Sequence, residues 1–358
     1  MLKKYRGVLI GLLCVAVVIV AIVLLNGGTQ DFHEKYEGVD LTTDVSGIGR
    51  GNTYDDYLLA HQDAGTGDAP VAVDVVAFEG KGATAGEVDG VPYVDTLDGS
   101  EVTWKVTVEK AGMYNIELDY CSASDVESRG VDMEREIHIN GELPFAGAAT
   151  LEFSRLWHDA PRKDAEGNLI EGFARDNQGN EIRPSQVEVF DVWQKAYCKD
   201  DMGYKIEPYQ FYFEAGENTI TLKALNEPMR IRSITLMPVQ ALATYAEYSA
   251  AAPQVEMTEE GKKWQLTLQG ERSDLRSTPS LYGRYDRSSP DTKDSTGKDT
   301  DVYHTVLNYI GGDPWNQAGQ WIQWDFDVPE DGYYVITMHD QQNFVRGINV
   351  YRKIYIDG

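Results

Sequence analysis

Aromatic side chains stand among amide, carboxylate and guanidinium groups in one long polar segment, residues 153–204. They include Trp157, Trp193, Tyr197 and Tyr204. An aromatic ring can stack on the flat C–H face of a sugar, and neighbouring Asp, Asn and Gln side chains can hydrogen-bond its hydroxyl groups. These four residues are therefore candidates for contacts with a carbohydrate.

A second group of the same kind lies near the end of the chain, in the Gly-rich stretch YIGGDPWNQAGQW. It contributes Trp315 and Trp321 to the carbohydrate-binding candidates. The alternative for all six aromatic residues is a structural one, in which they cover the ends of a sandwich or fill a contact between domains. The residues alone leave both interpretations open.

Motifs for catalysis are not found in this sequence. It contains no G-x-x-x-x-G-K-[ST], no H-E-x-x-H and no G-x-S-x-G, and its six histidines are scattered without metal-ligand spacing. Carboxylates are abundant, but abundance alone does not identify an acid–base pair. The sequence predicts a non-catalytic protein without a cofactor.

The charge of the chain restricts its partners. With 58 acidic and 32 basic residues, the net charge is −26, and the residues after 27 carry −29 because residues 1–27 hold three basic residues and no acidic ones. A field of this sign repels nucleic acid and anionic lipid surfaces. Neither is expected as a partner.

The elements that must position the candidate residues begin with a membrane anchor at residues 1–27. Val8–Leu25 is an unbroken apolar run that follows Lys3, Lys4 and Arg6, and about 27 Å of helix nearly spans a hydrocarbon core. The run ends without a small-x-small cleavage site, which favours an uncleaved anchor over a signal peptide. We expect a single-pass protein of the cell membrane, with a cytoplasmic N-terminus and the acidic body outside.

Residues 28–66 are polar and predict a stalk, with one short helical stretch, TYDDYLLAHQ. From residue 67 to 240, short runs of alternating apolar and polar residues are separated by Gly, Asp and Asn, as in VTWKVTV, YNIELDY and NTITLKAL. Period-2 strands of this kind predict an all-β fold, a β-sandwich. Cys121 is expected in a strand and Cys198 in a polar loop, and whether they form a disulfide is left open.

An internal repeat indicates a second sandwich at residues 263–358, after a linker at 241–262. EVTWKVTVEKAGMYNIEL (101–118) aligns without a gap on WIQWDFDVPEDGYYVITM (321–338). The matched pairs are Trp104 and Trp324, Val108 and Val328, Gly112 and Gly332, Tyr114 and Tyr334, Ile116 and Ile336, Arg135 and Arg352, Ile137 and Ile354, and Ile139 and Ile356.

Alternation assigns roles within the repeat. The two tryptophans and the isoleucines are expected in a core, because they share a face with other apolar residues. Arg135 and Arg352 are expected to point away from the isoleucines, either to a carboxylate or to water. The first copy needs residues 142–239 to finish its sandwich, so we expect the second module to be incomplete at Gly358.

The order of these motifs, W-x-V-x-V, G-x-Y, R-x-I-x-I-[ND]-G and YFEAGENTITLKAL, resembles carbohydrate-binding modules of the β-jelly-roll type. The stretches ARDNQGNEIRPSQVE and IGGDPWNQAGQWIQWDFDVPEDGYYVITM resemble the amino-terminal region of long, surface-anchored solute-binding proteins of Gram-positive bacteria. The resemblance covers most of residues 67–358. It implies two sugar-binding-like sandwiches preceding a solute-binding domain that serves the membrane subunits of an ABC importer.

The resemblance also implies limits. Jelly-roll sugar modules often hold a structural calcium with an acidic residue in the last strand, and here Arg232 and Ser233 stand where that residue would be. Calcium is therefore not expected in the first module. The implied function is extracytoplasmic binding of an oligo- or polysaccharide, and the alternatives are an accessory role in a cell-surface glycoside hydrolase and a purely structural spacer.

Overall fold

The computed structural model describes residues 52–288, 293–300, 303–342, 347 and 349–357. The expected anchor at residues 1–27 and the stalk up to residue 51 lie outside the described residues, as does Gly358. None of the helices in the described ranges is both long enough and apolar enough to cross a bilayer.

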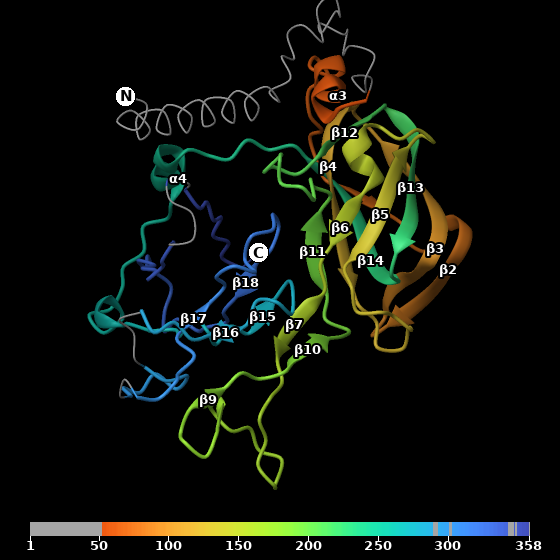
Figure 1. Cartoon of the computed structure of the whole chain (residues 1–358). Coiled ribbons are helices and arrows are strands. Elements are labelled where there is room, and N and C mark those ends of the chain that lie inside the picture. Colours follow the sequence, from red (N-terminus) through yellow and green to blue (C-terminus); the bar gives the residue numbers. More distant parts are fainter. Residues whose placement is uncertain (1–51, 289–292, 301–302, 343–346, 348, 358) are drawn as a thin grey trace, which may run out of the picture. The chain divides into compact units, whose positions relative to one another are not determined.

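Ten strands of the first module are joined in the order β11-β4-β14-β3-β13-β5-β6, with β1 on β14, β12 on β4 and β2 on β3 (Figure 1). All of these pairings are antiparallel. The strands are β1 (Val71–Val73), β2 (Phe78–Val88), β3 (Val91–Val108), β4 (Gly112–Cys121), β5 (Met133–Ile139), β6 (Leu151–Phe153), β11 (Gln194–Tyr197), β12 (Gln210–Phe213), β13 (Gly216–Asn226) and β14 (Met229–Pro238).

The long strand β3 connects the two layers of this sandwich. Residues 94–96 pair with β14 in one layer, and residues 101–108 pair with β13 in the other. Gly99, between the two stretches, has a φ of 71°, a left-handed conformation that glycine adopts without strain. The first module is therefore the β-sandwich that the sequence predicts.

The core of the sandwich lies between these layers. Trp104 is completely buried and its Nε1 donates a hydrogen bond to the Val75 carbonyl over 2.9 Å. Because side chains alternate along a strand, the inward positions of every long strand contribute. Fully buried core residues include Val94, Val102, Trp104, Ile116, Leu118, Met133, Ile137, Phe211, Phe213, Ile220, Ile231, Ile234 and Leu236. For the first copy, the predicted core is confirmed.

The orientation predicted for Arg135 is wrong. Residues 135, 137 and 139 have the same parity on β5, so Arg135 shares the inward face with the two isoleucines and is completely buried. Its guanidinium donates to the Asn226 carbonyl over 2.9 Å and to Thr96 Oγ1 over 3.2 Å. Burial lowers the pKa of Arg135 to about 10. It faces neither a clamped carboxylate nor water.

The segment just before residue 67 is packed on the sandwich rather than extended as a stalk. Its predicted helix is confirmed as α3 (Tyr54–Ala60), with Thr53 as the N-cap. The Tyr54 and Tyr57 hydroxyls accept hydrogen bonds from backbone N–H groups of β12 over 2.9 and 2.7 Å, and both rings lie against the core. α3 is therefore part of the first module, ahead of the boundary predicted at residue 67.

Both cysteines of the described chain are free and buried. Cys121 ends β4, as expected. Cys198 is not in a polar loop, because it follows β11 directly, is completely buried and donates its N–H to the Ile116 carbonyl. The two thiols thus lie at separate positions along β4, and no disulfide joins them.

A small four-stranded sheet lies outside the sandwich, in the order β10-β7-β15-β18 (Figure 1). It combines β7 (Leu156–Asp159) and β10 (Gln186–Val189) with β15 (Leu275–Arg276) and β18 (Ile322–Gln323). Two further pairs are β8 (Ala174–Arg175) with β9 (Glu181–Ile182) and β16 (Gly283–Arg284) with β17 (Tyr309–Ile310), and the short helices are η3 (Ala146–Ala149), α4 (Tyr245–Ala251) and η4 (Gly261–Lys263). α4 lies within the segment 241–262 that the sequence predicts as a linker.

The described residues after 263 do not form the second sandwich that the repeat predicts. Their strands are two residues long, and the described parts of 324–357 contain none. Trp324 is only half-buried, while Phe326 and Ile354 are exposed. The core predicted for the second copy is therefore wrong, because in this structure these residues have no strands on which to pack.

Candidate functional site

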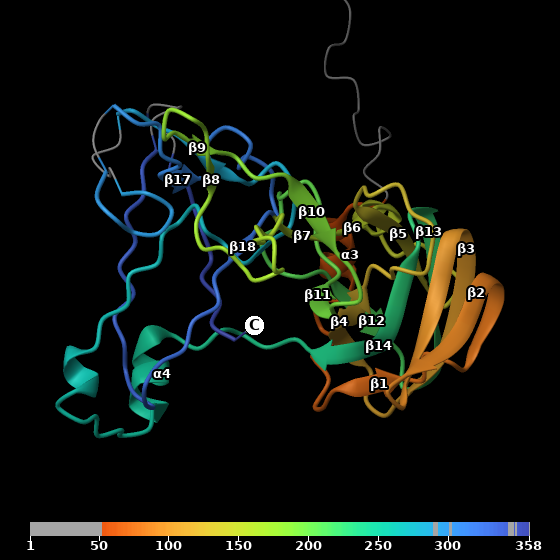
Figure 2. The same cartoon turned by 90° about the horizontal axis from the view of Figure 1, so that it is seen from below.

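β11, β4 and β14 are neighbouring strands of one layer (Figure 2). The outer face of this layer carries a group of polar and aromatic side chains. On β4, Ile116 and Leu118 face the core, so Glu117 and Asp119 face outward. The strand pairing places Lys195 and Ser233 on either side of Asp119. In the next row Tyr197 and Thr235 flank Glu117.

A β-bulge in β14 adds one more outward residue. The register shifts between Ile231 and Ser233, so Arg232 is the extra residue opposite β4. Its Nε donates to Asp119 Oδ2 over 2.9 Å, and its guanidinium carbon lies 4.7 Å from the centre of the Trp193 ring. The bulge thereby joins an aromatic ring, a cation and a carboxylate.

Asp119 is the most deeply buried polar group of this face. It is 5 % exposed, Arg232 binds its Oδ2, and its Oδ1 has no hydrogen-bond partner among the described residues. An unpaired buried carboxylate oxygen is costly, and a hydroxyl or amide donor that reached it would remove that cost.

Glu117 forms the neighbouring polar group. Lys195 Nζ lies 3.1 Å from Glu117 Oε1, and Tyr197 lies opposite Glu117 in the pairing of β11 with β4. Burial, and after it the Glu117 charge, raises the pKa of Tyr197. The phenol therefore stays neutral and can donate a hydrogen bond at physiological pH.

A second cationic group forms the rim of the face. Arg230 makes a bidentate ion pair with Asp95 over 2.7 and 2.9 Å, binds Asp125 over 2.9 Å and stacks 4.2 Å from the Tyr93 ring. Burial raises the pKa of the nearby Cys121 thiol to about 12, so no thiolate forms there. The rim is a closed ion-pair network that holds the edge of the site in place.

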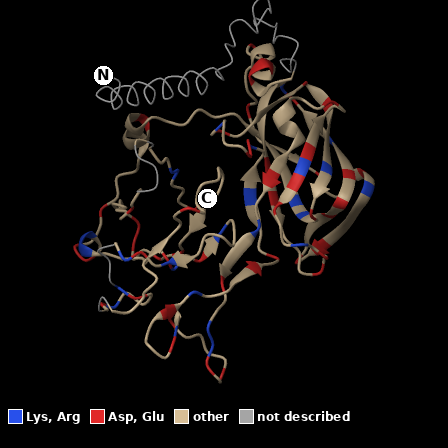
Figure 3. Ribbon diagram, viewed as in Figure 1, with Lys and Arg blue, Asp and Glu red and all other residues tan. Residues whose placement is uncertain are grey.

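Basic and acidic residues are interspersed along the strands of the first module (Figure 3). On the outer face described above, Arg232 and Lys195 are each paired with a carboxylate of β4. The face therefore offers both donors and acceptors beside an aromatic ring, the combination that recognises a sugar. It offers no activated nucleophile.

The structure brings together two of the six aromatic candidates. Trp193 and Tyr197 lie on the same side of one layer, because they are four residues apart along an extended segment. Tyr204 is 81 % exposed in a loop. It is not part of this face.

The other three candidates lie elsewhere. Trp157 shares a row of the small sheet with Ile322, so Trp321 faces the opposite side of that sheet. Trp315 packs within its own loop: a Cβ on Gly311 would lie 2.7 Å from the ring, and Arg352 stacks on the ring at 4.2 Å. For Trp315 these contacts favour the structural interpretation.

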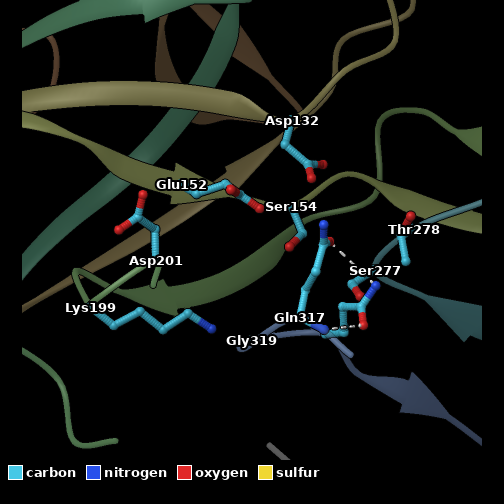
Figure 4. A pocket seen from close by; sticks show the side chains of 10 residues that line it. Asp132, Glu152, Ser154, Lys199, Asp201, Ser277, Thr278, Gln317 and Gly319 are labelled. Carbon is cyan, nitrogen blue, oxygen red and sulfur yellow. Dashed lines mark hydrogen bonds between the residues drawn. The ribbon is translucent and has the colours of Figure 1, made fainter. Parts of the chain in front are cut away.

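A small pocket lies between the first module and the loop that carries Trp315 and Trp321 (Figure 4). Its volume is about 20 Å³, room for a single water molecule but not for a sugar ring. Its lining is polar and comprises Asp132, Glu152, Ser154, Lys199, Asp201, Ser277, Thr278, Gln317, Gly319 and Gln320.

Asp132 and Glu152 are two acidic residues of this pocket, and the charge of Asp132 acts on Glu152. Partial burial, and after it the Asp132 charge, raises the pKa of Glu152 to about 7. Burial also lowers the pKa of Lys199. The pocket is therefore a contact whose charge changes with pH.

Sequence reasoning found the aromatic part of the outer face but not its polar part. The signal for Glu117 and Asp119 is present in YNIELDY, where they alternate with core residues. The sequence draws attention to Arg232 only because it stands where jelly-roll sugar modules often have an acidic residue. In the described part of the chain no cluster of three or more His, Cys, Asp or Glu residues is arranged to hold a metal ion.

Comparison with known proteins gives a limited answer. No family model matches the chain. No curated protein matches it either.

Several solved structures are similar at low sequence identity. A family 35 carbohydrate-binding module from Clostridium thermocellum is 14 % identical, with 47 % of this chain and 98 % of that chain covered and a TM-score of 0.29. A GH26-CBM35 β-(1,4)-mannanase from Podospora anserina is 17 % identical, with 49 % and 29 % covered and a TM-score of 0.28. The C-terminal CBM6 of the laminarinase LamC from Zobellia galactanivorans is 12 % identical, with 47 % and 98 % covered and a TM-score of 0.26. The β-sandwich assignment follows from the strand pairing and the core of this chain.

Proposed function

We propose that the first module is a non-catalytic carbohydrate-binding module whose ligand, an oligo- or polysaccharide, lies on the outer face of β11, β4 and β14. The observation that carries this proposal is the position of the Trp193 ring beside Arg232 and Asp119. Asp119 also keeps one carboxylate oxygen without a hydrogen-bond partner among the described residues.

The chemistry of the face suggests how a sugar would bind. Arg232 covers one side of the Trp193 ring, so the C–H face of a pyranose would stack on the other side. Glu117 and Asp119 would accept hydrogen bonds from hydroxyl groups, and Lys195 and Tyr197 would donate them. Because each carboxylate already has a cationic partner, a neutral sugar fits this arrangement better than a charged one.

The cellular context is a further proposal, supported by the N-terminal apolar run and the resemblance of the sequence. The chain would be held at the cell membrane by residues 1–27, with the module outside the cell. It would present carbohydrate to an ABC importer, together with a solute-binding domain of the kind found in that family. The alternative context is a cell-surface glycoside hydrolase for which the module is an accessory.

Isothermal titration of the full chain in detergent, against a panel of neutral oligo- and polysaccharides, tests the binding proposal. With a glycan that binds, Trp193→Ala should weaken the affinity by roughly tenfold or more, because stacking on one aromatic ring is worth about 1–3 kcal/mol in comparable sites. Tyr245→Ala is the matched control, since Tyr245 is 83 % exposed on α4. The absence of heat with every glycan, or an equal loss in both variants, would reject the outer face as the binding site.

Fractionation of cells that produce the full chain tests the proposed location. We expect the protein in the membrane fraction, with the acidic body open to protease added from outside the cell. Recovery in a soluble fraction, or protection from external protease, would contradict it.

A further inference from the structure

Two arginine side chains converge on one tyrosine ring outside the ten strands of the first module. The guanidinium carbon of Arg183 lies 4.2 Å from the centre of the Tyr282 ring, and that of Arg284 lies 5.4 Å from the same point. Stacking on the ring holds both side chains in place. It also brings two positive charges close together, which is unfavourable unless an anion lies beside them.

These two guanidinium groups have no partner of opposite charge. Neither makes a hydrogen bond or an ion pair with the described residues, although the chain as a whole carries a net charge of −26. Arg175, on the neighbouring β8, is by contrast paired with Asp294 over 2.6 Å. The N–H donors of Arg183 and Arg284 are therefore available to a ligand.

The carboxylates that lie nearest in sequence have other partners. Glu181 Oε1 accepts hydrogen bonds from the N–H and the hydroxyl of Ser295, and its Oε2 accepts from the Leu307 N–H. Asp286 Oδ1 accepts from the N–H and the hydroxyl of Ser288, each over 2.7 Å. Neither carboxylate neutralises the two arginines.

Backbone hydrogen bonds fix the segments that carry the arginines. The Glu181 N–H donates to the Thr305 carbonyl over 2.8 Å, and the Asn308 N–H donates to the Arg284 carbonyl over 2.8 Å. Residues 305–308 thus join β9 to β16. The two side chains are held together by the fold as well as by the ring.

The side chains point to the accessible side of β16. A Cβ on Gly283 would lie 3.2 Å from the Glu271 Cβ, so Gly283 faces the buried side of the strand. Because side chains alternate along a strand, Tyr282 and Arg284 face the other side. Both are half-buried, and Arg183 is exposed. A ligand can therefore reach the site from solvent.

We infer that Arg183 and Arg284 form a binding site for a tetrahedral oxyanion, a phosphate or sulfate group. This site is separate from the outer face of β11, β4 and β14. Each guanidinium presents a planar fork of N–H donors that takes two oxygens at once. A carboxylate has only two oxygens, which a single fork occupies, whereas a phosphate or sulfate group has enough oxygens for both forks. Its charge also offsets the repulsion between the two arginines.

The ligand carries one such group rather than many. The acidic body of the chain repels a polyanion, so a nucleic acid does not fit this site. The same tetrahedral group occurs as a free ion and as an ester on a sugar. Both sources present the same chemistry to the two arginines.

Phosphorus NMR with the full chain in detergent at constant salt tests the site, with inorganic phosphate as the probe. Exchange onto the protein broadens the phosphate resonance, and a titration gives the affinity. Arg183→Gln and Arg284→Gln should each weaken binding by about tenfold or more, because each removes one charged fork. Arg287→Gln is the matched control and should bind like the wild type, since Arg287 is an exposed arginine outside the pair that stacks on Tyr282.

The conservative variants and a second probe sharpen the test. Arg183→Lys and Arg284→Lys keep the charge but not the fork, so they should weaken binding by a smaller factor than the glutamine variants do. Glucose-6-phosphate is the second probe. Tighter binding of this ester than of inorganic phosphate would support a sugar phosphate as the ligand, and the reverse order would support the free ion.

Three results would overturn the inference. The first is the absence of broadening with either probe. The second is equal broadening in the wild type and in both glutamine variants, which would place the phosphate elsewhere. The third is displacement of phosphate by an equal concentration of acetate, which would show that the site does not select a tetrahedral group.

Discussion

The two copies of the repeat begin with the same pattern and end in different structures. In the first, Trp104 is completely buried and β3, β4 and β5 are paired by β13 and β14. In the second, Trp324 is half-buried and the described residues after it form no strand. The turn before Tyr114 and before Tyr334 is nevertheless the same.

This difference separates local from long-range determinants of a sandwich. A turn of four residues needs only its own sequence, whereas a strand needs partners that lie about a hundred residues away, as β13 does from β3. Alternation makes a segment able to form a strand. The presence of neighbouring strands decides whether it does.

The largest expected effect compares the two tryptophans. Trp104→Ala should lower the free energy of unfolding of the first module by about 3–5 kcal/mol, because it opens a cavity in the core and removes the hydrogen bond to Val75. Trp324→Ala should change it by less than about 0.5 kcal/mol, as expected for a residue outside that core. Urea unfolding followed by tyrosine fluorescence or circular dichroism measures both, and equal losses would contradict the assignment of the core.

Replacement of Arg135 should lower the free energy of unfolding of the first module more than replacement of Arg352, but the difference should be smaller than for the two tryptophans. Arg135→Ala removes hydrogen bonds to Asn226 and Thr96 and leaves a cavity, so we expect a loss of about 2–4 kcal/mol. Arg352 is exposed, and Arg352→Ala should have almost no effect on the first module. If thermal denaturation shows Arg135→Ala to be as stable as the wild type, the buried guanidinium is not a structural element of the core.

The helix caps provide a third pair. Thr53 caps α3, whose Tyr54 and Tyr57 lie on the core, so Thr53→Ala should cost about 1 kcal/mol. Thr244 caps α4, which has no buried residue, and Thr244→Ala should leave the unfolding of the sandwich unchanged. A measurable loss from Thr244→Ala would mean that α4 contributes to the first module.

The smallest expected effect is a pH dependence at the pocket between the first module and the Trp315 loop. The pKa of Glu152 is raised to about 7, so the folded state holds this proton more tightly than the unfolded chain does. Its contribution to stability is complete below about pH 4.5 and is lost as the pH rises to about 7. Because the side chain is partly exposed, we expect a change of less than about 1 kcal/mol. Glu152→Gln should flatten this dependence in unfolding experiments between pH 4.5 and 7, and an unchanged slope would contradict it.

The sequence predicts the parts of the fold that depend on local pattern. Period-2 alternation identifies the strands around Trp104 and Ile137, and the short helical stretch TYDDYLLAHQ contains α3. The prediction that Arg135 points away from the isoleucines is wrong. Alternation itself indicates the observed orientation, because Arg135 is two residues before Ile137 and therefore lies on the same face of the strand. Cys198 was misplaced because its polar neighbours hide a strand end that pairs with β4.

The candidate site was predictable only in part. Trp193 and Tyr197 are conspicuous as aromatic residues in a polar segment. Their relation to Asp119 and Arg232 depends on the pairing of β11 with β4 and on a bulge in β14, which join residues more than seventy positions apart. No local pattern encodes that register.

Hydrogen exchange of the full chain without any additive tests the central claim most directly. If only the first copy holds a paired sandwich, amides of residues 112–121 should remain protected for hours, whereas those of the equivalent residues 332–341 should exchange within seconds to minutes. Similar protection in both segments would contradict the account, because it would mean that residues 332–341 form a paired strand as residues 112–121 do.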